Sequence, residues 1–231
     1  MLCEDNHFFY PKMKTLFMLK RLDNSTKWGV TEGHLLPETA PLHFYPINEL
    51  RFFEKIDGTN MGLEVEDGDV IGGVKKEEEI IFSGTTDKYY VEMYNNIRNI
   101  LEQCSEHKAL EHVTFFGELC GVKIQSGGNY FQSRKFLIFD IFDHVNGVFF
   151  RWNAIKHFCG LLGLETVPEL VYPYDSLSID NVKMFLDNQM SVFNPEYHAE
   201  GFVVRHCDDT SVEKRYVAKI RYKDFPRIKA S

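Results

Sequence analysis

The residues with the clearest capacity for chemistry form the run EKIDGTN, residues 54–60, which follows an apolar segment. A lysine such as Lys55 becomes a nucleophile when burial or a neighbouring cation favours loss of its proton. Gly58 lets the backbone turn tightly and approach a ligand closely. Asp57 can orient the lysine or bind a ribose hydroxyl. An ordinary β-turn beside a solvated lysine is the competing interpretation of this run when it is taken alone.

Further polar positions follow in the order that nucleotide chemistry on a lysine would need. They lie in the segments FGE (116–118), FD (139–140), EGF (200–202) and KIR (219–221). Glu118 and Glu200 each lie at the end of an apolar strand pattern, where carboxylate oxygens can hold Mg²⁺. Each of the two is also consistent with a charge that pairs within a sheet or lies at an exposed strand edge.

The aromatic and cationic residues of these segments also have a structural interpretation beside the nucleotide-binding one. Phe139 lies inside an aromatic-rich segment, residues 136–142, so core packing competes with stacking on a purine. Lys219 and Arg221 are two residues apart, so on a strand both side chains point to one side, which suits a phosphate group. A solvated basic edge that discourages strand pairing is the alternative.

Other classes of site have no support in the sequence. The nine histidines show no metal-binding spacing, and we find no nucleotide-binding glycine loop and no hydrolase nucleophile motif. The five cysteines are odd in number and lack CxxC spacing, which argues against a disulfide framework and favours an intracellular protein with reduced thiols.

Composition sets the broad class. A length of 231 residues with 44% hydrophobic content predicts one domain, or one large and one small lobe. The short apolar patches near the N-terminus are broken by basic residues, so neither a signal peptide nor a membrane span is predicted. The net charge of −8 does not indicate a nucleic-acid binder, but basic residues crowd into residues 214–229 around a lone Asp224, so a local basic surface is compatible with the sequence.

The hydrophobic pattern predicts an α+β fold with antiparallel sheets. We expect strands over residues 51–56, 61–65, 70–74, 113–118, 135–142, 148–152, 200–205 and 215–222. Hairpin turns are predicted at Asp67-Gly68 and Asn146-Gly147. Helices are predicted over residues 88–110, 153–162 and 180–188, the second ending at Gly163.

Taken in order, these motifs resemble those of the covalent nucleotidyltransferase superfamily, which contains polynucleotide ligases and mRNA capping enzymes. The greatest resemblance is to ATP-dependent RNA ligases of the phage T4 RNA ligase 2 type. EKIDGTN resembles their nucleophile motif, and FGELCG with Ile124-Gln125 and Tyr130 resembles their third motif. FD, EGFVV and KIR resemble the three motifs that follow, so the resemblance spans roughly residues 50–225.

The resemblance implies an antiparallel-sheet nucleotidyltransferase (adenylation) domain over residues 1–231, without an OB-fold module. Within it, residues 1–50 would be an N-terminal extension and residues 50–225 the motif-bearing core. The implied reaction is ATP-dependent RNA ligation. Lys55 would take AMP from ATP as a lysyl-adenylate, AMP would pass to an RNA 5′-phosphate, and a 3′-hydroxyl would displace it.

The implied roles of single residues follow from the same motifs. Lys55, Lys219, Arg221 and Glu200 would be catalytic, and Glu200 and Glu118 would bind Mg²⁺ or Mn²⁺. The nucleotide would be held by Glu54, Ile56, Asp57, Asn60, Glu118, Phe139, Asp140 and Lys75. The implied partner is RNA, or DNA as an alternative, with no membrane, in a monomeric intracellular protein, such as one from a virus or a phage-infected cell.

Two departures from the family pattern affect this comparison. No arginine occurs between Lys55 and Arg98, where the family usually has one, so Lys75 or Lys76 would have to replace it. Arg221 stands where a lysine is common, a change that keeps the charge. A minimal DNA ligase, a GTP-using guanylyltransferase and a non-catalytic nucleotide- or RNA-end-binding domain therefore stay open as alternatives.

Overall fold

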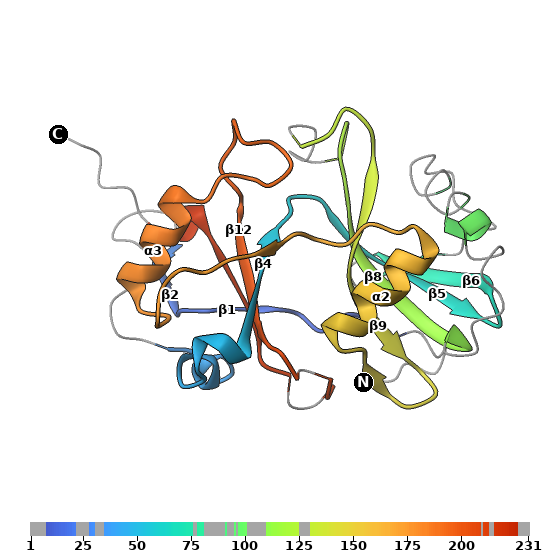
Figure 1. Ribbon diagram of the computed structural model, residues 1–231, viewed down its shortest axis with the longest axis horizontal. Helices are drawn as coiled ribbons and strands as arrows, with labels where there is room; N and C mark the ends of the chain where they lie inside the picture. Colours follow the sequence, from blue (N-terminus) through green and yellow to red (C-terminus); the bar gives the residue numbers. More distant parts are fainter. Residues whose placement is uncertain are drawn as a thin grey trace. The chain divides into compact units, whose positions relative to one another are not determined.

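The structure is a computed structural model that describes residues 8–21, 28–30, 35–75, 78–80, 91, 95, 97–100, 110–124, 130–208, 210–212 and 215–225 (Figure 1). The chain forms two compact units. Unit 1 contains Met1–Pro11, Asp57–Thr166 and Thr210–Glu213, and unit 2 contains Lys12–Ile56, Val167–Asp209 and Lys214–Ser231. The single nucleotidyltransferase domain expected over residues 1–231 stays a prediction, since two such units can belong to one domain.

Unit 1 is built on a six-stranded sheet with the strand order β10-β9-β8-β5-β6-β7, in which every described pair is antiparallel. Its strands are β5 (Thr59–Glu66), β6 (Asp69–Lys75), β7 (Glu78–Ile80), β8 (His112–Cys120), β9 (Lys135–Asp143) and β10 (Val148–Phe149). The predicted strands over 61–65, 70–74, 113–118 and 135–142 are confirmed within these bounds.

Both predicted hairpin turns are present in unit 1. Asp67 and Gly68 have φ angles of 50° and 87° between β5 and β6, and two consecutive positive φ angles are what a tight two-residue hairpin needs. Gly147, with φ of 67°, closes the turn between β9 and β10. Positive φ is accessible to glycine without steric cost, which explains why a glycine stands at each turn.

The predicted strand over 148–152 is wrong at its end, because Trp152 begins a helix. Helix α2 (Trp152–Leu162) starts with hydrogen bonds from the N–H groups of Ala154 and Ile155 to the carbonyl of Arg151. Trp152 is buried on the same helix face as Ile155, Cys159 and Leu162, so its spacing from these residues is that of one apolar stripe of a helix. Gly163 ends the helix in a left-handed conformation, as predicted, and α2 packs against β9 (Figure 1).

The predicted helix over 88–110 lies mostly outside the described residues. Residues 91, 95 and 97–100 are helical, and Ile97 of the predicted apolar stripe is buried. Tyr90, Tyr94 and Leu101, the other members of that stripe, are not among the residues that the structure describes.

Unit 2 contains a five-stranded sheet with the order β1-β13-β12-β4-β11 and a two-stranded sheet of β2 and β3. The strands are β1 (Lys14–Thr15), β2 (Leu19–Arg21), β3 (Trp28–Val30), β4 (Leu50–Lys55), β11 (Glu169–Leu170), β12 (Gly201–His206) and β13 (Val217–Arg221). Its described pairs are antiparallel except β1 with β13. The strands predicted over 51–56, 200–205 and 215–222 are confirmed as β4, β12 and β13.

One face of this sheet carries the core of unit 2. Alternate residues of the three central strands, including Phe52, Phe202 and Ile220, are buried in one cluster. Helix α3 (Ile179–Asn188) adds Val182, Phe185 and Leu186 to the same cluster. The prediction of a helix over 180–188 is confirmed, and Ser178 caps it by accepting a hydrogen bond from the Asn181 N–H.

The intervening residues of the central strands point to the opposite face, which is rich in cations. By strand alternation this face carries Arg51 and Lys55 of β4, Arg205 of β12, and Lys219 and Arg221 of β13. Strand alternation therefore gathers five basic side chains on one side of the sheet, where Arg205 is buried against Phe53.

The remaining described elements are short 3₁₀ helices: η1 (Ala40–His43), η2 (Ile47–Glu49) and η5 (Tyr222–Asp224). Taken together, the antiparallel sheets and few helices of the described residues confirm the predicted α+β class. Within the same residues, no helix combines the length and the apolar run needed to cross a membrane.

Candidate active site

A glycine separates the candidate nucleophile from the candidate phosphate-binding arginine. Gly201, the first residue of β12, pairs with Lys55 on β4 and with Arg221 on β13. A Cβ atom at this position would lie 2.0 Å from the carbonyl oxygen of Ile220, so no larger residue can take the same backbone position. The close approach of β12 to β13 at this glycine brings two cations into one row across the sheet.

Lys55 makes an ion pair with Glu200, the residue just before β12. The ammonium Nζ donates to Glu200 Oε2, and the two side chains are 21% and 17% exposed. The other carboxylate oxygen of Glu200 lies 4.0 Å from the Nζ of Lys223. This pair places a carboxylate directly beside the candidate nucleophile.

Lys219 lies two residues before Arg221 on the cationic face. Burial is the main cause that lowers the pKa of Lys219, and the charges of Lys55 and Arg221 lower it further. Glu200 and Asp224 act in the opposite direction. The structure therefore brings together four residues that the sequence predicts to be catalytic: Lys55, Glu200, Lys219 and Arg221.

Arg221 has a carboxylate partner that the sequence analysis did not identify. Its Nε and one terminal nitrogen donate to Asp224 at 2.8–3.2 Å, and its backbone N–H donates to the same carboxylate at 2.9 Å. Asp224 is buried, and hydrogen bonding to it is the main cause that raises the pKa of Arg221. The signal available in the sequence was that Asp224 is the lone acid within the basic C-terminal run.

Glu54 points away from the cationic face, because it alternates with Lys55 along β4. Its Oε2 accepts a hydrogen bond from the Val192 N–H at 2.8 Å, whereas the buried Oε1 has no hydrogen-bond partner among the described residues. Burial is the main cause that raises the pKa of Glu54, and hydrogen bonds from Ser191 and Val192 oppose the shift. Ile56, the next candidate after Lys55, is also buried.

The raised pKa of Glu54 predicts a specific pH dependence of stability. The folded protein binds this proton more tightly than the unfolded chain does, so stability falls as pH rises from the ordinary glutamate value of 4.5 through the raised value. Glu54→Gln removes this titration and is expected to gain stability relative to the parent protein as pH rises through that window. Urea unfolding from about pH 4 to pH 8 measures the difference. A Glu66→Gln control, at an exposed position, should show the same dependence of unfolding free energy on pH as the parent protein. If the unfolding free energies of Glu54→Gln and the parent changed in parallel with pH, the prediction would be contradicted.

In unit 1, two candidate nucleotide-binding residues lie opposite each other. Asn60 on β5 pairs with Glu118 on β8, and both are partly exposed. Gly58 precedes them, and a Cβ atom on this glycine would lie 2.4 Å from the Leu119 carbonyl oxygen. Asp57 begins this unit. Glycine at position 58 therefore lets the chain pass directly over the end of β8.

Phe139 and Asp140 lie at a β-bulge, where the pairing changes from Phe116 with Asp140 to Gly117 with Ile138. Phe139 is the extra residue of the bulge, and bulges re-aim side chains. Tyr10 donates a hydrogen bond to buried Asp140 at 2.8 Å, and its ring meets the Phe139 ring at a centroid distance of 5.0 Å. Phe139 is partly buried against the aromatic cluster of Phe116, Phe142 and Phe149, which agrees with the core-packing alternative.

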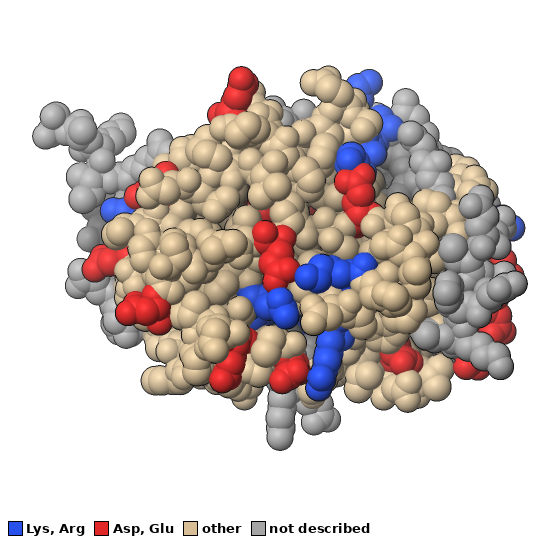
Figure 2. Space-filling model, viewed as in Figure 1, with Lys and Arg blue, Asp and Glu red and all other residues tan. Residues whose placement is uncertain are grey.

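The remaining candidates are described only in part. The backbone of Lys75 pairs with Met61 at the end of β6, and its side chain lies outside the described residues. Lys76 and Gln125 also lie outside them, as do Lys214, Arg227 and Lys229 of the basic C-terminal run. Among the residues coloured in Figure 2, basic side chains lie in small groups beside acidic ones on the face in view.

Antiparallel sheets that carry a strand-end lysine, a neighbouring glutamate and a row of cations agree with the nucleotidyltransferase class that the motifs predict. The chain matches the model of the RNA ligase family over residues 48–221, and it therefore belongs to that family. A comparison with curated protein sequences gives no significant match.

Solved structures show the same fold. A variant of Naegleria gruberi RNA ligase without ligand aligns with a TM-score of 0.61 and 16% identity over 93% of this chain. A variant of that enzyme with ATP and Mn gives 0.61 and 17% over 92%, and one with AMP and Mn gives 0.62 and 16% over 90%. The present chain covers 57–59% of the length of these Naegleria chains.

Proposed function

We propose that this protein is an ATP-dependent RNA ligase that works through a lysyl-adenylate on Lys55. The observation that carries the proposal is the cluster in unit 2. There Lys55 makes an ion pair with Glu200, and the side chains of Lys219 and Arg221 lie on the same face of the sheet as Lys55. A single nucleophile beside a carboxylate and two cations suits attack on a phosphate. Membership of the RNA ligase family supports the choice of RNA as the substrate.

The first step joins the Lys55 Nζ to the α-phosphorus of ATP. The bond from that phosphorus to the bridging oxygen breaks, and pyrophosphate leaves with the electron pair. Only a neutral amine has the lone pair for this attack, so a proton of the Lys55 ammonium must first pass to the adjacent Glu200 carboxylate or to water. Lys219 and Arg221 stabilise the negative charge on the transferring phosphoryl group, and Asp224 fixes the orientation of the Arg221 guanidinium.

The second and third steps pass the adenylate to RNA. An oxygen of the RNA 5′-phosphate attacks the same phosphorus, and the bond from phosphorus to Lys55 Nζ breaks. A 3′-hydroxyl then attacks the activated 5′-phosphate, loses its proton, and expels AMP. The cationic face serves each step for the same reason, since every step moves a negatively charged phosphoryl group.

The carboxylate oxygens of Glu200 are donors that suit a divalent cation. Glu200 offers carboxylate oxygens, which Mg²⁺ and Mn²⁺ prefer, and Glu118 is the second proposed ligand on the basis of its motif. When bound, such an ion polarises phosphoryl oxygens as a Lewis acid. The proposed nucleotide contacts are Glu54, Ile56, Asp57, Asn60, Glu118, Phe139, Asp140 and Lys75. Among these, the Oε1 of Glu54 retains unused acceptor capacity.

The proposal is tested first by nucleotide labelling. The protein is incubated with ATP or GTP labelled at the α-phosphate, with Mg²⁺ or Mn²⁺, and then denatured. We expect label from ATP that survives denaturation. Label from GTP alone would replace the proposal with a guanylyltransferase. No label from either nucleotide, in protein shown by mass to be free of bound adenylate, would replace it with a non-catalytic binding domain.

The acceptor is tested next with nicked duplexes and single strands whose 3′-hydroxyl strand is RNA or DNA. A 5′-adenylated intermediate followed by a sealed product is expected with RNA 3′-ends. Sealing of DNA ends with equal or greater efficiency would assign the chain to the DNA ligases instead.

A further inference from the structure

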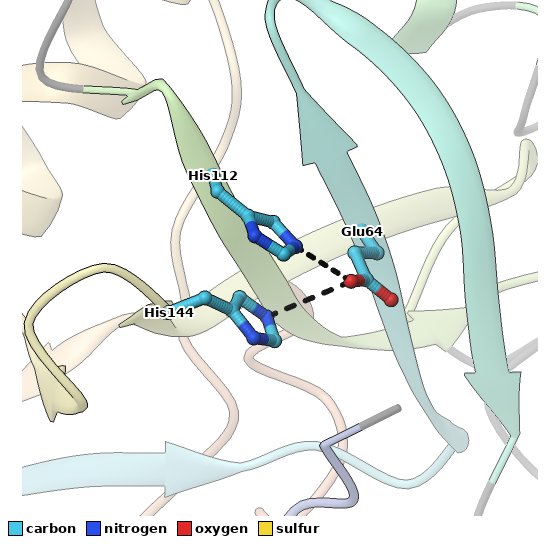
Figure 3. Close-up of side chains that lie close together, drawn as sticks. All are labelled: Glu64, His112 and His144. Carbon is cyan, nitrogen blue, oxygen red and sulfur yellow. Dashed lines mark hydrogen bonds and ion pairs between the residues drawn. The ribbon is translucent and has the colours of Figure 1, made fainter. Parts of the chain in front are cut away.

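Three side chains that no nucleotidyltransferase motif includes converge in unit 1 (Figure 3). They are Glu64 on β5, His112 at the start of β8, and His144 directly after β9. The Nε2 of His112 lies 2.7 Å from Glu64 Oε1, and the Nε2 of His144 lies 4.0 Å from the same oxygen. One ligand atom from each residue lies within 4.8 Å of the others.

The surrounding contacts hold the two imidazoles toward Glu64. The rings of His112 and His144 stack at a centroid distance of 4.1 Å with an interplanar angle of 9°. The backbone N–H of His144 donates to the His112 carbonyl at 3.0 Å. Phe142 and Phe8 meet the His144 ring edge-on at 5.1 and 6.5 Å. Backbone pairing and aromatic packing therefore define the positions of both histidines.

This cluster is distinct from the candidate nucleotide-binding residues on the same sheet. Glu64 pairs with Thr114, whereas Asn60 pairs with Glu118, four residues away along both strands. At the usual rise of a β-strand this separation is about 13 Å. Glu64 and His144 are nearly buried, with side chains 6% and 12% exposed, whereas His112 is 27% exposed and gives access from solvent.

We propose that Glu64, His112 and His144 form a binding site for a zinc-class divalent cation. Two imidazole nitrogens and one carboxylate oxygen are a ligand set that Zn²⁺ accepts, with a fourth position left for water or a hydroxyl. Mg²⁺ and Ca²⁺ prefer oxygen ligands alone, so the ion expected here differs in class from the one proposed for phosphoryl transfer. The proposal does not rest on the ligase activity.

To hold such an ion, the two imidazole rings must turn out of their stacked arrangement, because a metal on Nε2 lies in the plane of its ring and the two planes are only 9° from parallel. Bond lengths of about 2.0–2.1 Å and tetrahedral angles place ligand atoms about 3.3 Å apart. The distance from His112 to Glu64 must therefore lengthen from 2.7 Å, and the distance from His144 to Glu64 must shorten from 4.0 Å. Rotation about the side-chain torsions would have to supply both changes. Thr114 Oγ1, now 2.7 Å from His144 Nε2, is placed to bond a water at the fourth position.

The bound ion would act as a cross-link within the sheet. Glu64, His112 and His144 lie on or directly beside β5, β8 and β9, which are neighbours in the strand order. A ligand that binds the folded chain and not the unfolded one raises stability by mass action. An ion bound here would therefore stabilise the sheet of unit 1.

The test is zinc binding by the full chain after removal of metal with a chelator. We expect one Zn²⁺ per chain by equilibrium dialysis and elemental analysis, and a higher unfolding midpoint with zinc than without. Co²⁺ should give the intense visible absorption of tetrahedral coordination by nitrogen and oxygen. If the parent chain retains no zinc after dialysis, the proposal is overturned without any variant.

Variants assign the ion to these residues. Glu64→Gln, His112→Ala and His144→Ala should each weaken zinc binding by at least about 100-fold, because loss of an outer-sphere partner alone costs about 10–100-fold. His157→Ala, at an exposed position of α2, is the matched control and should bind as the parent does. Circular dichroism without zinc identifies any variant that fails to fold. Substitution of His112 is the least disruptive to folding, because His112 is the most solvent-exposed of the three ligands. Unchanged zinc binding in a folded His112→Ala variant would overturn the proposal.

Discussion

Lys55→Ala is expected to form no covalent adenylate, with a loss of at least about 1000-fold in the rate of labelling from ATP. The reason is chemical, because the substitution removes the amine that would form the bond to phosphorus. Lys55→Arg is expected to be equally inactive, since a guanidinium keeps the charge near Glu200 but stays protonated at any working pH. The measurement is denaturation-stable label from ATP labelled at the α-phosphate, compared at equal protein concentration.

Lys223→Ala is the matched control for Lys55. Lys223 also approaches the Glu200 carboxylate, at 4.0 Å, but its side chain is 67% exposed and lies outside the strand row. Its loss should leave labelling within about threefold of the parent, as expected for an exposed ion pair of little energy. Full labelling of Lys55→Ala would show that another residue is the nucleophile. The site proposed in unit 2 would then be wrong even if the protein ligates RNA.

Asp224→Ala is expected to have the second largest effect. It leaves the Arg221 guanidinium without the buried carboxylate that accepts three of its hydrogen bonds, and leaves the Arg221 backbone N–H without its acceptor. Removing one partner of a buried ion pair costs about 3 kcal/mol of unfolding free energy. Because Arg221 would also lose its fixed orientation, we expect slower adenylate formation at saturating ATP. Urea unfolding and single-turnover labelling measure the two effects separately.

A conservative variant at position 224 separates the orientation of Arg221 from the effect on stability. Asp224→Asn keeps the volume and one acceptor oxygen, so it should recover part of the stability and of the labelling rate. Asp187→Ala, at an exposed position of α3, is the control for the general loss of an acidic residue. An Asp224→Ala protein that is destabilised yet labels at the parent rate would show that Asp224 has a structural role alone.

The sequence predicted the strands of the motif-bearing core and the turns between them. Short runs rich in apolar residues along 51–56, 200–205 and 215–222 mark the central strands of unit 2, and Asp67-Gly68 and Gly147 mark hairpins that only small or turn-forming residues allow. The short strands β1, β2, β3, β7 and β11 were not predicted, because two or three residues carry too little pattern. The end of the 148–152 prediction failed because Trp152 suits a strand and a helix equally, and packing of α2 decided between them.

The sequence also predicted which residues of unit 2 belong together, although their roles in catalysis stay proposals. Lys55, Glu200, Lys219 and Arg221 were selected by the order of their motifs. Their proximity depends on strand register, with Gly201 between Lys55 and Arg221. No sequence pattern indicated that the Glu54 side chain would accept a hydrogen bond from Val192, or that Tyr10 would donate one to Asp140. Both contacts join residues more than a hundred positions apart.

By itself the sequence determined the local elements of this protein, its α+β class, and the set of residues with chemical potential, because those depend on residue type and on spacing along one strand or helix. Only the tertiary structure decided which of those residues meet. The pairing of Arg221 with Asp224 depends on the tight turn that begins at the end of β13. The convergence of Glu64, His112 and His144 depends on the register of three strands. Register is set by the packing of whole faces, and that information is not contained in the spacing of any one motif.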